Sequence, residues 1–441
     1  MHQQQQSNST MYKHESDDSM LSQQKPDGPS AMMQHQKEDT MMPQRKVEVP
    51  SVSMQPEFAM LLPTDPLSPM SWPLWKKVYT SLASFMAVFT ILYTTTTLST
   101  AIPALPMALK TSTHLANLAF SIPFFGVTLA PIYTPHATER FGRKPVYLVS
   151  FFLFSFVVLG GSFATTISQV LAIRFTAGLA AGPCAVLIEG TFADIWPASK
   201  TVSYYVFIAL SQYWGAGFGQ VIGAFVLRNK GDVAWLSYVA LIFCAFTFVL
   251  LVYMPETYAR EILRQKNKKC PGLPLAPALS GVTIRQMATH TLFNPVKMFF
   301  FEPLVIMCTL YLGLNFALVF QWFITVPFVL SNVYGYSGTS VGLAFLSAII
   351  GSIIAAVLSL VLDVVPKRDA HGMAKIETRM FPAMLGSVLI VVALFWVGWS
   401  ADPSTRAIVP IVGTGVFVCG NMMILVSPIP FRSKINKENF Y

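Results

Sequence analysis

The chain has 441 residues, of which 53% are hydrophobic and only 12% are charged. A soluble core cannot bury so large an apolar fraction, so the composition indicates an integral membrane protein surrounded by a lipid bilayer. The net charge of +9 would favour nucleic-acid binding in a soluble domain. Here, however, the lysines and arginines fall mainly between long apolar runs, as in the cytoplasmic loops of membrane proteins, so we expect no nucleic-acid partner.

Residues 1–72 form a polar N-terminal segment that is rich in Gln, Ser and Met and has no sustained hydrophobic period. Such a segment cannot bury enough apolar surface to fold, and it predicts a disordered cytoplasmic tail. Its histidines are irregularly spaced, and the five cysteines of the chain include no CxxC pair. We therefore expect no metal site, no disulfide framework and no cofactor.

Ten apolar runs follow the tail, and each is close to the roughly 20 residues that a helix needs to cross about 30 Å of hydrocarbon. The sequence therefore predicts an all-α, polytopic membrane protein. Six runs fall in residues 73–258 and four in residues 298–427, and a basic loop at 259–297 separates the groups. An even number of spans before this loop places it on the same cytoplasmic side as the N-terminus. The runs are 78–102, 115–133, 146–163, 170–192, 202–226, 235–254, 301–330, 341–362, 380–399 and 408–427.

A short charged segment, residues 135–145, separates the second and third runs. Gly142 permits a tight reversal, and Pro145 suits the first turn of the next helix. The segment therefore predicts a cytoplasmic hairpin loop. The carboxylate of Glu139 can pair there with one of three neighbouring cations, Arg140, Arg143 and Lys144.

The fourth run contains two charged residues, Arg174 and Glu189, fifteen positions apart. At about 100° per residue they differ by only about 60° around a helix, so both can face one interior surface. A charge inside a bilayer is costly, and its usual explanation is a partner or a water-filled pathway. Alternatively, Glu189 braces the charged hairpin from the cytoplasmic end of the helix.

Two further sets of residues stand out within the apolar runs. Three glycines recur every four residues in the fifth run and predict close approach of another helix to one face: Gly215, Gly219 and Gly223. Three polar residues interrupt the seventh run and are candidates for the lining of a substrate site: Tyr311, Asn315 and Gln321.

Together these motifs resemble those of the major facilitator superfamily. Residues 135–145 are similar to the loop between the second and third spans of that family, although Pro135 stands in place of its leading Gly. Arg174 and the small residues after it resemble a fourth-span motif whose arginine is implicated in proton coupling. The glycines of the fifth run resemble the antiporter motif Gly-x-x-x-Gly-Pro-x-x-Gly-Gly, with Gln220 in place of the Pro. Pro255 and the residues after it are similar to the fungal twelve-span drug:proton antiporters.

The resemblance covers residues 72–425 and implies the major facilitator fold with about ten of its twelve helices present. Residues 428–441 are rich in lysine and asparagine and resemble nothing in the family. In the family, the loop after the second span packs against the eleventh span, which has no counterpart here. Because the sequence changes abruptly, we favour a mispredicted or frameshifted gene product over a genuine short form.

The resemblance implies a plasma-membrane transporter that exports small amphipathic drugs or xenobiotics by alternating access, with protons as the coupling ion. The implied coupling or gating residues are Arg174, Glu189, Glu139, Arg140, Gly142, Arg143 and Lys144.

Two alternatives stay open. One is a carrier of polyamines or other small organic cations on the same fold, and the other is a truncated remnant that does not transport. An enzyme is not expected, because the chain has no Walker loop and no His-Glu-x-x-His or Gly-x-Ser-x-Gly motif. The residues do not indicate an oligomeric state.

Overall fold

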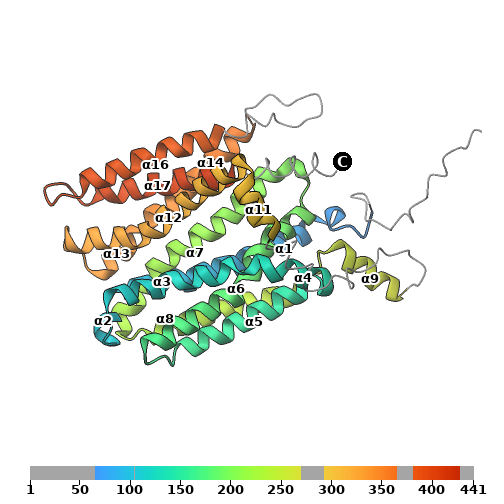
Figure 1. Ribbon diagram of the computed structural model, residues 1–441, viewed down its shortest axis with the longest axis horizontal. Helices are drawn as coiled ribbons and strands as arrows, with labels where there is room; N and C mark the ends of the chain where they lie inside the picture. The colour runs from blue at the N-terminus through green and yellow to red at the C-terminus, as the bar shows by residue number, and fades with distance from the viewer. Residues whose placement is uncertain (1–64, 104, 270–292, 365–380, 428–441) are drawn as a thin grey trace, which may run out of the picture. The chain divides into compact units, whose positions relative to one another are not determined.

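The computed structural model describes residues 65–103, 105–269, 293–364 and 381–427 (Figure 1). Helices make up most of these residues, and no β-strand occurs among them, so the all-α prediction is confirmed. Most of the expected N-terminal tail, the stretch 270–292 and the last residues, 428–441, lie outside the described part of the chain.

The helices are α1 (Leu74–Thr97), α2 (Leu105–Ala108), α3 (Thr113–Thr128), α4 (Ala130–Phe141), α5 (Arg143–Gly161), α6 (Ile167–Ile195), α7 (Thr201–Lys230), α8 (Ala234–Tyr253), α9 (Ala259–Lys269), α11 (Asn294–Phe301), α12 (Pro303–Asn332), α13 (Gly338–Ala344), α14 (Leu346–Val364), α16 (Phe381–Ser400) and α17 (Ile408–Val426), with short 3₁₀ helices η1 (Pro69–Ser71), η2 (Leu98–Ala101) and η3 (Ala198–Lys200). We call α1–α8 the first half and α12–α17 the second half.

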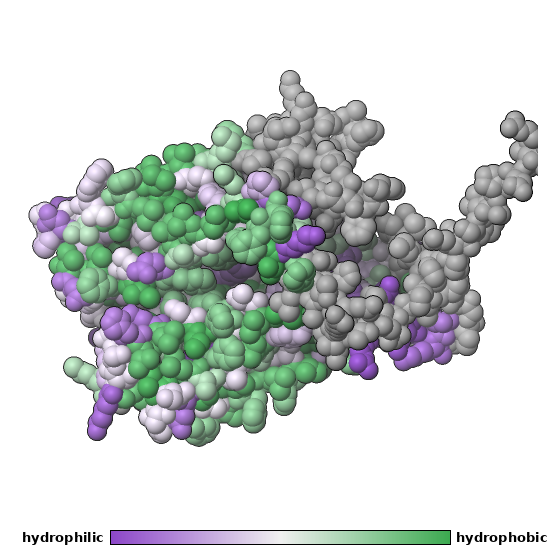
Figure 2. Space-filling model, in the orientation of Figure 1, coloured by the Kyte–Doolittle hydropathy of each residue, from purple (hydrophilic) through white to green (hydrophobic). Residues whose placement is uncertain are grey.

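Eight helical segments of the described residues are long and apolar enough to cross a membrane, or nine when the bent pair of α3 and α4 counts as one span. Their outward faces carry large apolar side chains; Phe156 on α5 is 66% exposed and Ile242 on α8 is 69% exposed. Most of the coloured surface in Figure 2 is correspondingly hydrophobic, and its hydrophilic residues lie mainly toward the ends of the helices. Such surfaces suit hydrocarbon rather than water.

The charged segment between the second and third runs is mostly helical, which corrects the expectation of a hairpin loop. The second run divides into α3 and α4, which meet at a 43° bend. Pro131 sits in the first turn of α4, and this helix continues as far as Phe141. Only Gly142, with φ of +88°, separates α4 from α5, and such a backbone angle suits a residue without a side chain. Pro145 lies in the first turn of α5, as expected.

Two other stretches are more ordered than the sequence suggested. The basic stretch expected as a loop begins with helix α9 and ends within α11. Residues 65–72, assigned to the disordered tail, contain η1, and the ammonium of Lys76 lies 3.7 Å from the centroid of the Trp72 ring just after it. This contact of a cation with an indole face links the residues before α1 to its first turn.

α7 is 30 residues long but is not among the apolar candidate spans. It corresponds to the fifth apolar run, and its surroundings explain its weaker hydrophobicity. It packs along α1 on one side and along α13 and α14 on the other, between the two halves (Figure 1). A helix covered by protein on both sides needs small and polar residues for packing more than it needs a surface for lipid.

Glycines allow this packing on both sides of α7. A Cβ atom at Gly219 would lie 2.8 Å from the main-chain oxygen of Tyr93 on α1, and one at Gly223 would lie 2.9 Å from the methyl group of Thr97. Gly215 likewise approaches the backbone of α1. On the opposite side, a Cβ at Gly217 would lie 2.7 Å from Ile349 of α14. The spacing of Gly215, Gly219 and Gly223 predicts the close face toward α1, but the sequence does not predict the one toward α14.

Replacement of Gly219 by alanine is expected to lower the thermal stability of the purified protein. The added methyl group would force α7 away from α1, at a cost of about 1–3 kcal/mol. The matched control is Gly313→Ala on α12, because nothing lies within 4 Å of a carbon added there. That variant should unfold at the wild-type temperature or slightly above it, since alanine favours a helix. Equal unfolding temperatures for the two variants in detergent would contradict the packing described here.

Candidate functional site

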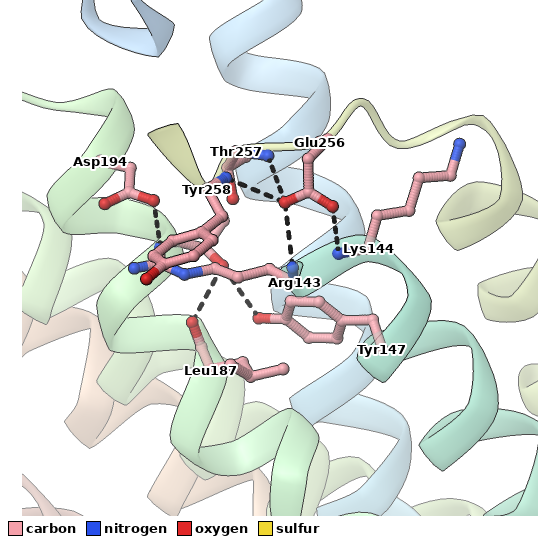
Figure 3. Close-up of polar contacts among 9 residues, drawn as sticks. Arg143, Lys144, Tyr147, Leu187, Asp194, Glu256, Thr257 and Tyr258 are labelled. Carbon is pink, nitrogen blue, oxygen red and sulfur yellow. Dashed lines mark hydrogen bonds and ion pairs between the residues drawn. The ribbon is translucent and has the colours of Figure 1, made fainter. Parts of the chain in front are cut away.

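A cluster of polar groups joins three helices of the first half at the turn between α4 and α5. We call it the Glu256 cluster; its members are Arg143, Asp194, Glu256 and Tyr258 (Figure 3). Glu256 follows the end of α8, where Pro255 cannot continue the helical hydrogen bonds. Its side chain therefore points from an extended stretch toward the start of α5.

The carboxylate of Glu256 accepts four main-chain hydrogen bonds. Its Oε1 accepts from the N–H groups of Arg143, Thr257 and Tyr258 at 3.0, 3.0 and 2.9 Å, and its Oε2 accepts from Lys144 at 3.0 Å. Arg143 and Lys144 are the first two residues of α5, so this carboxylate satisfies free N–H groups and faces the positive end of the helix dipole. Gly142 leaves the necessary space, since a Cβ there would lie 2.7 Å from Oε2.

The guanidinium of Arg143 pairs with Asp194 near the end of α6, with Nη1 and Oδ2 2.5 Å apart. The two side chains are only 14% and 25% exposed, so water screens this pair weakly. A Cβ at residue 190 would lie 2.9 Å from Nη2, and Gly190 therefore admits the guanidinium. Burial raises the pKa of the Tyr258 phenol, so its ring stays neutral beside the Arg143 guanidinium. The cluster thus ties α5 to both α6 and the chain after α8.

Arg174 lies far from this cluster, in a cavity of about 320 Å³ within the first half. The cavity is lined by parts of α1, α3, α5, α6 and the start of α8, and most lining side chains are apolar. Nη1 of Arg174 donates a hydrogen bond to the main-chain oxygen of Thr94 on α1, at 3.1 Å. Thr166 and Gln169 form a capping box at the start of α6, about two turns before Arg174.

A third polar group links the two halves, and we call it the latch: Tyr213 on α7, Asn421 on α17 and Asn315 on α12. The hydroxyl of Tyr213 donates to the side-chain oxygen of Asn421. The side-chain nitrogen of Asn421 donates in turn to the side-chain oxygen of Asn315, at 2.8 Å. All three residues are buried, so these bonds replace bonds to water.

Comparison with known proteins shows the family. The model of the Major Facilitator Superfamily matches residues 84–433 of this 441-residue chain. The chain belongs to the major facilitator superfamily. Its relatives include the MFS-type transporter atr4 of Stereocaulon alpinum, which is 30% identical over 379 residues, covering 84% of this chain and 68% of the relative. Efflux pump FUB11 of Gibberella moniliformis is 27% identical over 83% of this chain and 63% of its own length.

The chain thus spans about two thirds of the length of these superfamily relatives. Among solved structures, the xylose transporter XylE from E. coli, in a partially occluded inward-open conformation, gives a TM-score of 0.57 at 15% identity. That match covers 82% of this chain and 87% of XylE and shows the shared fold. Membership of this superfamily indicates a membrane transporter.

The structure does not bring together the charged residues of the segment 135–145 that the sequence predicts to pair with one another. Arg143 pairs with Asp194 instead of Glu139, because α4 stays helical and holds Glu139 on its own surface, half-buried. Arg140 is exposed, and its main-chain oxygen accepts a hydrogen bond from Arg264 on α9. The sequence did not predict Asp194 as the ion-pair partner of Arg143, or Glu256 as the acceptor for the first N–H groups of α5. The only available signal for Glu256 was its place directly after a proline at the end of an apolar run.

Arg174 and Glu189 do not share the cavity. Glu189 is not among its lining residues and is exposed. At about 1.5 Å per residue, the fifteen positions between them span roughly 22 Å along α6. The shared interior surface that the helical angle suggested is therefore not a shared cavity. Coupling roles for both residues remain predictions.

The three residues of α12 that are candidates for substrate binding lie in different surroundings. Asn315 is buried in the latch. Tyr311 is 40% exposed, and its hydroxyl lies 2.7 Å from that of Ser387 on α16. Gln321 is exposed and bonds to Thr325 one turn along the same helix. None of the three lines the Arg174 cavity, and their role toward substrate stays a prediction.

Replacement of Glu256 by glutamine is expected to destabilise the start of α5 by about 1–3 kcal/mol, because the charge facing the helix dipole and one good acceptor are lost. Thermal unfolding and hydrogen exchange of the first turn of α5 would measure the effect. Glu302→Gln is the matched control, since Glu302 stands at the start of α12 without a side-chain capping bond. If both variants behaved alike, the capping role of Glu256 would be refuted.

Proposed function

We propose that this chain exports small amphipathic molecules by alternating access of its two halves, driven by a proton gradient. Superfamily membership and relatives named as efflux pumps support export. The observation that carries the proposal is the seam between the halves, where α7 contacts α13, α14 and α17. Close but largely uncharged contacts at such a seam allow one half to rock against the other around a central site.

Aromatic side chains at this seam suit an amphipathic substrate. The rings of Trp322 on α12 and Phe417 on α17 stack with centroids 4.0 Å apart, and Tyr213 of α7 lies at the same small apolar pocket. The indole N–H of Trp322 is buried and has no hydrogen-bond partner among the described residues. A buried free donor beside aromatic faces is a suitable contact for an acceptor on an otherwise apolar molecule.

Transport is tested with the purified chain in liposomes whose interior is acidic, using the dye ethidium as the probe. The wild-type chain should accumulate the dye, and collapse of the pH gradient with an ionophore should stop the uptake. Arg174→Ala is expected to reduce uptake to the background leak, because a buried charge makes the inward and outward forms differ in energy. Lys230→Gln removes an equal charge at an exposed position and should transport normally.

Two outcomes of that experiment would count against the proposal. No gradient-dependent uptake of dye by the folded wild-type chain would overturn proton-driven export. Full uptake by Arg174→Ala would remove this arginine from the coupling step and leave export itself intact.

Replacement of Tyr213 by phenylalanine is expected to weaken the contact between the halves. The buried oxygen of Asn421 would lose its donor, at a cost of about 1–3 kcal/mol, which changes a conformational equilibrium by roughly fivefold to 150-fold. Spin labels at Ser203 on α7 and Met384 on α16, in a cysteine-free background, would report the distance between the halves. Tyr238→Phe, on the surface of α8, is the control. A distance distribution identical in both variants would contradict the latch.

A further inference from the structure

The Arg174 cavity is separate from the seam between the halves. All of its lining residues lie between Ile91 and Ser237, within the first half. Its walls are mainly apolar, with side chains such as Phe124 on α3, Val158 on α5 and Leu236 on α8. A cavity of about 320 Å³ is large enough for a molecule of about ten to fifteen non-hydrogen atoms.

Arg174 is the basic residue of the lining, and its charge has no ion-pair partner among the described residues. The acidic residue of the lining, Asp232, is exposed, and its carboxylate accepts a hydrogen bond from the main chain of Ala234 at the start of α8. The other acidic residues of the first half do not line the cavity. A guanidinium enclosed by apolar walls without a counter-charge is costly.

Two hydroxyl groups of the wall are already used as donors. Thr94 and Thr95 donate to main-chain oxygens of their own helix, those of Thr90 and Ile91, each at 2.8 Å. The guanidinium of Arg174, by contrast, has five N–H donors and one described hydrogen bond, to Thr94. It is therefore the charged group of this wall with several donors left for a ligand. The hydroxyl of Ser162, also in the lining, is buried and has no hydrogen-bond partner among the described residues, so it is a further donor.

We propose that this cavity binds a small amphipathic organic anion, with a carboxylate on the guanidinium of Arg174 and a flat apolar body against the surrounding walls. The planar fork of arginine matches a carboxylate, and the anion supplies the missing counter-charge. The mainly apolar walls favour an organic acid with an apolar body over inorganic phosphate, which is polar on every side. This site lies outside the transport path proposed at the seam, and binding to it can be measured without transport.

The probes are 1-naphthoate and its neutral analogue 1-naphthamide, and their binding to the detergent-purified chain is measured by calorimetry. The wild-type chain should bind the acid at least about tenfold more tightly than the amide, as expected for a charge-assisted hydrogen bond. Arg174→Gln should abolish this preference, and Arg174→Lys should restore part of it. Lys230→Gln, which removes a charge near the same end of the bundle, should keep the full preference.

A second variant tests the cavity itself. Ala177→Leu fills part of the space beside Arg174 and keeps the charge, so both probes should bind more weakly. This variant also decides the matter if Arg174→Gln fails to fold by circular dichroism. Equal binding of acid and amide to the wild-type chain would overturn the proposal, as would unchanged binding of the acid to folded Arg174→Gln.

Dodecanoate distinguishes a dissolved aromatic acid from a lipid-derived acid of the bilayer. Tight binding of 1-naphthoate with weaker binding of dodecanoate supports the small-acid site. Binding of dodecanoate alone would assign the cavity to a fatty acid and overturn the proposal. Failure of dye transport together with acid binding would refute the proposed export while leaving this site intact.

Discussion

The close approach of α7 to helices on both of its sides is the constraint on which the rest of the structure depends. Glycines bring the backbone of α7 against α1 on one side and against α14 on the other. α7 therefore belongs to the packing of both halves at once. Because tight packing resists continuous deformation, any movement between the halves must be a shift from one packed arrangement to another. The latch, in which Tyr213 reaches Asn421, lies at the point where such a shift has to break a buried hydrogen bond.

The first half is held differently at the turn between α4 and α5. There, one carboxylate satisfies four main-chain N–H groups, and an ion pair joins α5 to α6. Glu256 and Asp194 come from the chain after α8 and from α6, so three helix ends move together. The latch offers only uncharged hydrogen bonds across the seam. The first half is thus expected to move as a rigid body, with its adjustment concentrated at the contacts of α7.

Apolar runs and charge placement predicted the fold well, because each run carries its own signal of length and hydrophobicity. The site was less predictable. Asn421 lies more than 200 residues from Tyr213, and no local pattern links the two. Glu256 binds main-chain atoms, which every residue possesses, so its partners left no trace in residue types. The charges and Gly142 within residues 135–145 predicted a hairpin loop, whereas α4 continues through Pro135 as far as Phe141.

The charges of the first half fall into two classes that differ in how their cost is met. Arg143 is enclosed by its own protein partners, Asp194 and the ring of Tyr258, so its charge is explained by structure alone. Arg174 is enclosed by apolar walls, and its described hydrogen bond goes to a single carbonyl oxygen. An arginine needed only to hold helices together would be expected to have the first kind of surroundings. Enclosing the Arg174 guanidinium in apolar walls costs desolvation free energy. A bound ligand with a negative charge would offset that cost.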